Sequence, residues 1–564
     1  MKSFYKIIIT LILLPSLLIG CNDMLDVNSE SVAFTDEYTL TASNDTLYSM
    51  FAVFSKLSKL ADRYVILGEL RGDLMNLKED GSDKYLKEIN NFDISSDNPY
   101  ARKSDYYAVI NNCNYIISRI DTSVEKNAEK VMLRCYAACK AIRAWTYMQL
   151  VQNYGSAIYY DKPILSIEDA EKIQAQTPVS LEELTPVLIA DLEPYKDVAT
   201  PSLGYLYNFN TNKAYFPIRF ILGDLYLWNG QYEKAAKEYY DLINSQTYLI
   251  NYFTAAFKVT NNAFENIISF SAYGHFGIFL TSYQNLEQIS NIGATNQYGQ
   301  TFHMDSLTYN RTLYPSAIAL NNWDKQMYYY STILHKSGDL RKWGAVTTSF
   351  QINNSPIYNY ADSTSTLENY SIYKYIAMNP IKDDRFTEKR IGVYRVALLY
   401  LRYAEALNRM GKPNTAFAIL KNGLNKVNMN STSVIPHKEL NMNISESGDT
   451  TYSVPSFMNF TDSKFDYNIG IRMRSLGNVN LDKKFYIIPQ LASQEDSIRY
   501  VEDMIIEEAA LETAFEGNRF NDLMRIAIRR NDNSYLANKV AKKYTSNAEN
   551  IRNKLLIRSN WYIR

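Results

Sequence analysis

Histidine, cysteine and tryptophan, on which much enzyme and metal chemistry depends, are scarce in this sequence. Its 564 residues include 4 histidines, 4 cysteines and 5 tryptophans. The histidines are widely separated, at His275, His303, His335 and His437. No G-x-S-x-G, HExxH, P-loop or Rossmann glycine pattern occurs. We therefore expect a protein that is not an enzyme and that has neither a metal site nor a cofactor.

An excess of charge and long hydrophobic runs are missing as well. The formal net charge is -1 at pH 7, so nucleic acid is not expected as a partner. After the first twenty residues, no apolar run approaches the ~20 residues that a membrane-spanning helix needs.

Cysteine is too scarce for a disulfide framework. Apart from Cys21, the chain has Cys113, Cys135 and Cys139, and an odd number cannot be fully paired within one chain. Cys135 and Cys139 lie four positions apart on an expected helix, where a disulfide is geometrically difficult. We expect three small, buried residues with free thiols.

Residues 1–20 have the pattern of a signal peptide. Two lysines precede an apolar run at residues 7–19, which is too short to span a membrane. The run ends in Leu-Ile-Gly-Cys, which is similar to a bacterial lipobox, so we expect lipidation at Cys21 and a mature chain of residues 21–564. The acyl chains would hold the protein at a membrane. The alternative is an ordinary secretory signal followed by a chance cysteine.

The stretch from residue 215 to residue 243 has the spacing of a tetratricopeptide (TPR) hairpin. The matching positions are Leu222, Gly223, Tyr226, Gly230, Tyr232, Ala235 and Tyr239. Gly223 and Ala235 lack bulk, so two antiparallel helices can approach closely there. Gly230 accepts the positive φ of a tight turn. The alternative is any amphipathic helical hairpin.

Similar hairpins are expected near residues 127–155, 394–424 and 501–530, because one hairpin cannot bury its own apolar face. Their turn glycines are spaced far more widely than the ~34 residues of a regular repeat. The fold class is therefore mostly α, a scaffold of TPR-type hairpins with long irregular loop insertions. We place the insertions near residues 62–103, 250–390 and 430–495, and expect function there.

Near the C-terminus, carboxylates and arginines alternate at helical spacing. The set is Glu508, Glu512, Glu516, Arg519, Asp522 and Arg525. The three glutamates form an i,i+4 ladder on one expected helix face. Because the arginines follow at once, structural ion pairs are favoured over an acid–base pair across a cleft.

Aromatic residues in the insertions are the best candidates for ligand binding. Trp323 and Trp343 lie in the largest insertion, and Asn322 and Asp324 flank Trp323. An aromatic ring beside amide and charged groups suits a sugar, because the ring stacks on C–H surfaces and the polar groups bind hydroxyls. The alternative for each residue is packing within the loop.

Five segments together carry a family pattern. They are CNDMLDVNSE from Cys21, RAWTYMQLVQNYG at 143–155, LGDLYLWNGQYEKA at 222–235, YRVALLYLRYAEALNRMG at 394–411 and IIEEAALETAFEGNRF at 505–520. In these segments the chain resembles the SusD/RagB-like outer-membrane lipoproteins of Bacteroidota. The last segment departs from the family at Ala509, where an arginine is usual.

The resemblance implies a nutrient-binding protein of the cell surface, lipid-anchored in the outer membrane. It implies capture of a glycan without catalysis and a SusC-like TonB-dependent transporter as partner. In the family the site draws on an early loop and on the middle insertion, which adds Arg71, Asp73, Tyr100 and Tyr283 to the candidates. Two alternatives keep the same architecture: capture of peptides, or a TPR scaffold for another protein. A secreted hydrolase is the third alternative.

Replacing Cys21 tests the anchor. A Cys21→Ala protein should leave the membrane fraction, because no other segment is apolar enough to hold the chain there. The measurement is the distribution of the protein between supernatant and outer membranes after a high-salt wash. Recovery of the variant in the membrane pellet would contradict lipidation at Cys21.

Overall fold

A computed structural model describes most of the chain after residue 39. The described residues are 40, 43–80, 82–125, 130–202, 204–206, 209–250, 255–260, 263–268, 287–294, 303–329, 334–348, 367–376, 389–444, 450–452, 454–475 and 486–564. The expected signal peptide, Cys21 and Tyr283 lie outside them. Within the described part, no helix is long and apolar enough to cross a membrane.

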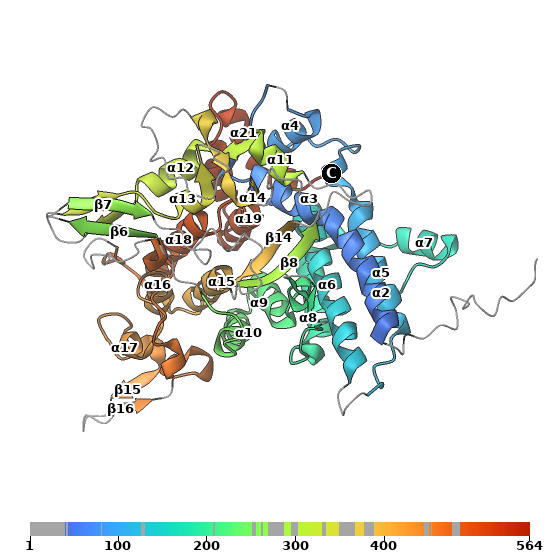
Figure 1. Cartoon of the computed structure of the whole chain (residues 1–564), viewed down its shortest axis with the longest axis horizontal. Coiled ribbons are helices and arrows are strands. Elements are labelled where there is room, and N and C mark those ends of the chain that lie inside the picture. The colour runs from blue at the N-terminus through green and yellow to red at the C-terminus, as the bar shows by residue number, and fades with distance from the viewer. Residues whose placement is uncertain are drawn as a thin grey trace, which may run out of the picture.

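Three long helices form one side of the molecule (Figure 1). They are α2 (Ser43–Leu57), α5 (Lys103–Arg119) and α6 (Val131–Tyr154), and α5 packs against both of the others. The region near 127–155, expected as a hairpin, is therefore a single helix. It ends at Gly155, whose φ of 78° closes the last turn. Cys113, Cys135 and Cys139 lie on α5 and α6 and are free thiols, as expected, but Cys135 is half-buried and not buried.

The central hairpin has the close approach that the sequence predicts. Its helices are α9 (Ile218–Trp228) and α10 (Tyr232–Asn244). A Cβ atom on Gly223 would overlap the ring of Tyr239, and Gly230 has a φ of 71° at the turn. The hydroxyl of Tyr239 donates a 2.6 Å hydrogen bond to Asp224 of the facing helix.

Two further hairpins follow and stack on the first. The first consists of α15 (Val396–Arg409) and α16 (Pro413–Lys421), with Gly411 at the turn. The second consists of α18 (Gln494–Glu512) and α19 (Arg519–Arg530). Helix α15 packs against α10 on one side and α18 on the other. The mostly α fold class is thus confirmed.

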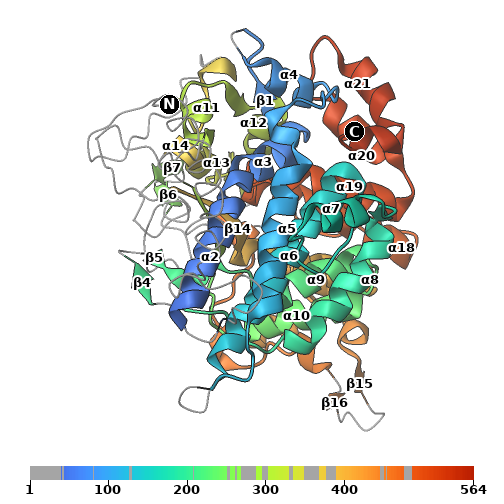
Figure 2. The ribbon, with the colours of Figure 1, turned by 90° about the vertical axis from the view of Figure 1, so that its right-hand side faces the viewer.

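Shorter elements complete the fold. The helices are α7 (Ile167–Gln174), α8 (Leu181–Leu192), α17 (Lys426–Met429), α20 (Asn533–Ala541) and α21 (Ala548–Leu555). The strand pairs outside the middle insertion are β2 (Ser156–Ala157) with β3 (Val179–Ser180), β4 (Tyr205–Leu206) with β5 (Phe209–Asn210), and β15 (Met442–Ile444) with β16 (Thr450–Tyr452). In both views α4 (Lys84–Asn90) and α21 lie at the same end of the molecule (Figures 1 and 2).

The middle insertion consists of small elements. They are β6 (Ala255–Thr260), β7 (Ala263–Ile268), β8 (Gln288–Ala294), α11 (Met304–Tyr309), β9 (Leu313–Pro315), α12 (Ala317–Asp324), β10 (Met327–Tyr329), β11 (His335–Ser337), α13 (Lys342–Ala345), β12 (Val346–Thr347), β13 (Ser371–Ile372), α14 (Tyr373–Ile376) and β14 (Lys389–Arg395). Strand β14 returns antiparallel to β8 and leads directly into α15. The insertion is therefore pinned to the scaffold where it ends.

The early segment is not the loop that the sequence predicts. Residues 61–77 form α3 (Ala61–Val65), a π-helical turn (Ile66–Leu70) and β1 (Met75–Leu77), and almost all of their side chains are buried. A Cβ atom on Gly68 would overlap the backbone of Gly517 in the α18–α19 turn. Charged residues of this segment have partners far along the chain; Asp73, for example, binds Arg519.

The close contact at Gly223 gives a stability prediction. Gly223→Leu should lower the free energy of unfolding by at least the ~1–3 kcal/mol of ordinary overpacking, because Tyr239 must move. Gly293→Ala in β8 is the matched control, since its Cβ would meet nothing within 4 Å. It should change stability by less than about 0.5 kcal/mol. Denaturant unfolding measures both, and equal losses would contradict the close approach.

Candidate functional site

A cluster of buried charged residues lies where the middle insertion meets the scaffold. Its acidic members are Glu287, Asp339, Glu508, Glu512 and Glu516, and its basic members are Arg341, Lys374, Arg395, Arg472 and Arg474. All ten are buried, and the formal charges cancel. A buried charge is tolerated only when it is paired and hydrogen-bonded, so each of these residues depends on the others.

Glu512 at the end of α18 is the centre of this cluster. Its carboxylate lies 2.8 Å from Arg395, 2.9 Å from Arg474 and 3.0 Å from Arg341. The same Arg395 binds Glu516 at 2.7 Å. Burial by itself would raise the pKa of Glu516, but Arg395 and Lys374 hold that pKa below its usual value.

These contacts confirm structural ion pairing but not the expected helical ladder. Helix α18 ends at Glu512, and Glu516 lies in the turn before α19, where Phe515 and Gly517 have positive φ. Most partners come from distant segments; Arg519, for example, binds Asp73 at 2.6 Å. The carboxylates of Glu512 and Glu516 are thus engaged by guanidinium and ammonium groups.

The early segment and the middle insertion are joined directly. Strand β1 pairs antiparallel with β9, with Met75 opposite Pro315. Ser316 donates its backbone N–H to Leu74 O at 2.7 Å and its hydroxyl to Asp73 O at 2.6 Å. The structure therefore brings together the two segments that the sequence analysis combined in one site.

A second join lies at the start of α11. The carboxylate of Asp62 accepts hydrogen bonds from the backbone N–H groups of His303 (2.8 Å) and Met304 (3.2 Å). Burial raises the pKa of Asp62 to about 6, although these two bonds oppose the shift. The first turn of this short helix is thereby held by a residue of α3.

Trp323 is a core residue, and its expected role as an exposed platform is wrong. Its side chain is 0% exposed, and its indole N–H donates a 3.1 Å hydrogen bond to Leu511 O of α18. The ring also contacts Phe515, with 6.0 Å between ring centroids. Helix α12 packs against α18 at this point, so the tryptophan fills the space between the two helices.

The outer edge of α12 is polar. The side chain of Asp324 is 52% exposed, and its two oxygens lie 2.7 and 2.9 Å from Lys342 Nζ. That ammonium group also lies 5.2 Å from the ring centroid of Tyr370. Asn322 is buried and accepts a 3.0 Å hydrogen bond from Lys325. The side chain of Trp343, which follows Lys342 in α13, lies outside the described residues.

The early candidates are placed differently from one another. Asp73 is buried, and its two carboxylate oxygens accept hydrogen bonds from Nε and Nη2 of Arg519, so it is not available to a ligand. Tyr100 is half-buried, and burial raises its pKa to about 12. Arg71 is buried but lies in the wall of a cavity.

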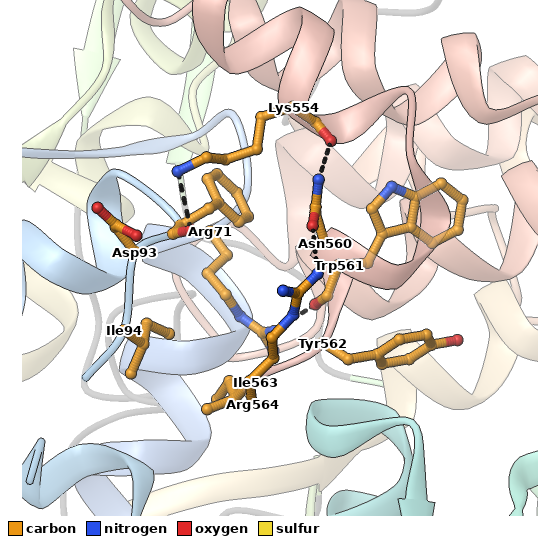
Figure 3. A pocket seen from close by; sticks show the side chains of 10 residues that line it. Arg71, Asp93, Ile94, Lys554, Asn560, Trp561, Tyr562, Ile563 and Arg564 are labelled. Atoms are coloured by element: carbon orange, nitrogen blue, oxygen red, sulfur yellow. Dashed lines mark hydrogen bonds between the residues drawn. The ribbon is translucent and has the colours of Figure 1, made fainter. Parts of the chain in front are cut away.

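This cavity has a volume of about 210 Å³ and lies between the early segment and the end of the chain (Figure 3). Its lining comprises Arg71, Phe92, Asp93, Ile94, Lys554, Asn560, Trp561, Tyr562, Ile563 and Arg564. The sequence analysis singled out only Arg71. No motif marks residues 554–564, and only the folded chain brings them to the early segment.

The chain is similar to known proteins in sequence and in fold. No protein-family model matches the chain. The chain is 29% identical over 250 residues to SusD-like protein P2 of Formosa agariphila, covering 43% of this chain and 46% of that protein. It is 23% identical over 442 residues to SusD-like protein P38 of the same organism, covering 74% and 82%.

A solved SusD-like carbohydrate binding protein of Bacteroides fragilis has the same fold. It superposes with a TM-score of 0.56 over 88% of each chain, at 16% sequence identity. The class is thus that of the SusD-like fold. The resemblance to the SusD-like family, which the five sequence segments indicate, is confirmed by these comparisons.

Trp323 and Asp324 of α12 test the assignment of one residue to the core and its neighbour to the surface. Trp323→Ala should lower the free energy of unfolding by about 3–5 kcal/mol, because it leaves a cavity and an unpaired carbonyl at Leu511. Asp324→Ala should cost less than about 1 kcal/mol, since it breaks a half-exposed ion pair. Chemical denaturation of the two variants measures the difference. A more stable Trp323→Ala than Asp324→Ala protein would contradict this assignment.

Proposed function

We propose that this chain is a cell-surface lipoprotein that captures a glycan and delivers it to a SusC-like TonB-dependent transporter. The observation that carries the proposal is the SusD-like fold over most of the chain, shared with a carbohydrate binding protein. The expected lipobox at Cys21 supplies the anchor. A binder with no pore of its own needs another protein to carry its ligand across the membrane.

The polar edge of α12 is the part of the described chain that we assign to glycan contact. Asp324 is exposed and oriented by Lys342, and Asn321 and Lys325 beside it are exposed as well. Carboxylate, amide and ammonium groups on a rigid element can bind several sugar hydroxyls at once. The rigidity comes from Trp323, which fixes the inner face of the same helix against α18. Little ordering of the protein is then needed when a ligand binds.

The buried charges support binding without turnover. Retaining and inverting glycosidases need two carboxyl groups that face the substrate, one of them with a raised pKa. In the cluster around Glu512, each carboxylate contacts at least one arginine or lysine and is withdrawn from solvent. This supports a capture protein over the hydrolase alternative.

Whole cells provide the test. The best-bound ligand from a panel of immobilised glycans and peptides is first identified with the purified protein. Cells should then bind this ligand and take it up, whereas cells without the transporter should bind it and take up none. An Asp324→Ala protein should lose at least about tenfold in affinity, the effect of removing a charge-assisted hydrogen bond.

The matched control is Glu168→Ala on α7. Glu168 is an exposed carboxylate that also pairs with a lysine, Lys172, at 2.8 Å. Its removal should leave binding unchanged. If the purified protein binds peptides and no glycan, the ligand is a peptide and not a glycan. Uptake by cells without the transporter would refute the delivery step.

A further inference from the structure

The cavity in Figure 3 has a distinctive charge balance. Three cationic side chains line it, those of Arg71, Lys554 and Arg564, against one acidic side chain, that of Asp93. Asp93 is exposed, so water screens its charge. Arg71, in contrast, is 1% exposed and cannot be screened in this way.

Arg71 differs from the other buried arginines that the structure describes. Arg63, Arg143, Arg341, Arg395, Arg402, Arg472, Arg474, Arg519 and Arg525 each have a carboxylate within 4 Å. Arg71 has no such partner among the described residues. A buried charge without a counterion is costly, and the same chain neutralises its other buried guanidinium groups.

The polar contacts of Arg71 are neutral and incomplete. Its guanidinium donates to Leu67 O at 2.7 Å, to Trp561 O at 3.0 Å and to Asn153 Oδ1. These bonds use three of its five N–H donors. The ring of Phe520 covers one face of the guanidinium, with 4.4 Å between the ring centroid and Arg71 Cζ. Burial lowers the pKa of Arg71 to about 10, which still leaves it charged at neutral pH.

The other two cations also have donors to spare. Lys554 Nζ donates 3.1 Å hydrogen bonds to the carbonyls of Asn91 and Phe92, which leaves one of its three N–H groups. Arg564 donates from Nη2 to Asn560 Oδ1 at 2.9 Å. Within the described chain, neither cation is paired with a carboxylate. The cavity therefore offers several charge-assisted donors to an anion.

We propose that this cavity binds the carboxylate of a small organic acid of about the size of a monosaccharide. The volume of about 210 Å³ has room for one sugar ring. Tyr562, which is half-buried, belongs to the same lining. The inference is independent of glycan capture at α12, because it concerns different residues and a different ligand.

Calorimetric titration of the full chain in mild detergent tests the site, with sodium glucuronate as the probe and glucose as its neutral match. Glucuronate should bind and glucose should not, and the affinity should fall with added salt. Arg564→Gln and Lys554→Gln should each weaken glucuronate binding by about tenfold. Arg564 is exposed, so its variant should fold normally even if replacement of Arg71 does not.

Two controls locate the effect. Lys172→Gln removes an exposed lysine on α7, which lies away from α21 in both views (Figures 1 and 2), and should leave glucuronate binding intact. Asp324→Ala should leave it intact as well, which separates this site from the glycan surface. The proposal would be overturned by absence of glucuronate binding, by equal binding of glucose, or by unchanged affinity in Arg564→Gln.

Discussion

The carboxylate of Glu512, held by Arg395, Arg474 and Arg341, is the contact on which the middle of the molecule depends. Each arginine comes from a different segment of the chain. A buried pair is strongly destabilised when one partner is removed, by about 3–5 kcal/mol. The cluster therefore specifies one placement of the insertion, because any other would leave charges unpaired.

The same reasoning explains the early segment. The carboxylate of Glu69 accepts hydrogen bonds from the backbone N–H groups of Phe515, Gly517 and Asn518 in the α18–α19 turn, at 2.8–3.1 Å. Gly68 lets the two backbones approach this closely, because a Cβ atom there would overlap the backbone of Gly517. Gly517 has a φ of 91°, and a Cβ atom there would overlap the ring of Tyr64. Through Asp73 and Arg519, the same turn also fixes β1. The turn is thus a junction between the start of the fold, its middle and its end.

The sequence predicts those features that depend on neighbours along the chain. Gly223, Gly230 and Tyr239 lie within one hairpin, so their spacing is sufficient to infer the close approach. Trp323 is different, because its burial is set by Leu511, 188 positions away. Asp73 lies in a segment expected to be an irregular insertion, and the arginine that binds it is 446 positions away. Candidate residues could be named from the sequence, but not which of them face solvent.

Among the buried charges, pairing distinguishes those that stabilise the fold from those that are left for a ligand. Asp73 and Arg71 are equal candidates in the sequence, yet Asp73 is paired with Arg519 at 2.6 Å. Arg71 is buried as well, but the hydrogen bonds that it donates go only to carbonyl and amide oxygens. Three neutral acceptors orient a guanidinium without cancelling its charge. The other buried arginines of the described chain are paired with carboxylates, whereas Arg71 lies unpaired beside a cavity. The cavity therefore has a positive electrostatic potential that favours an anion.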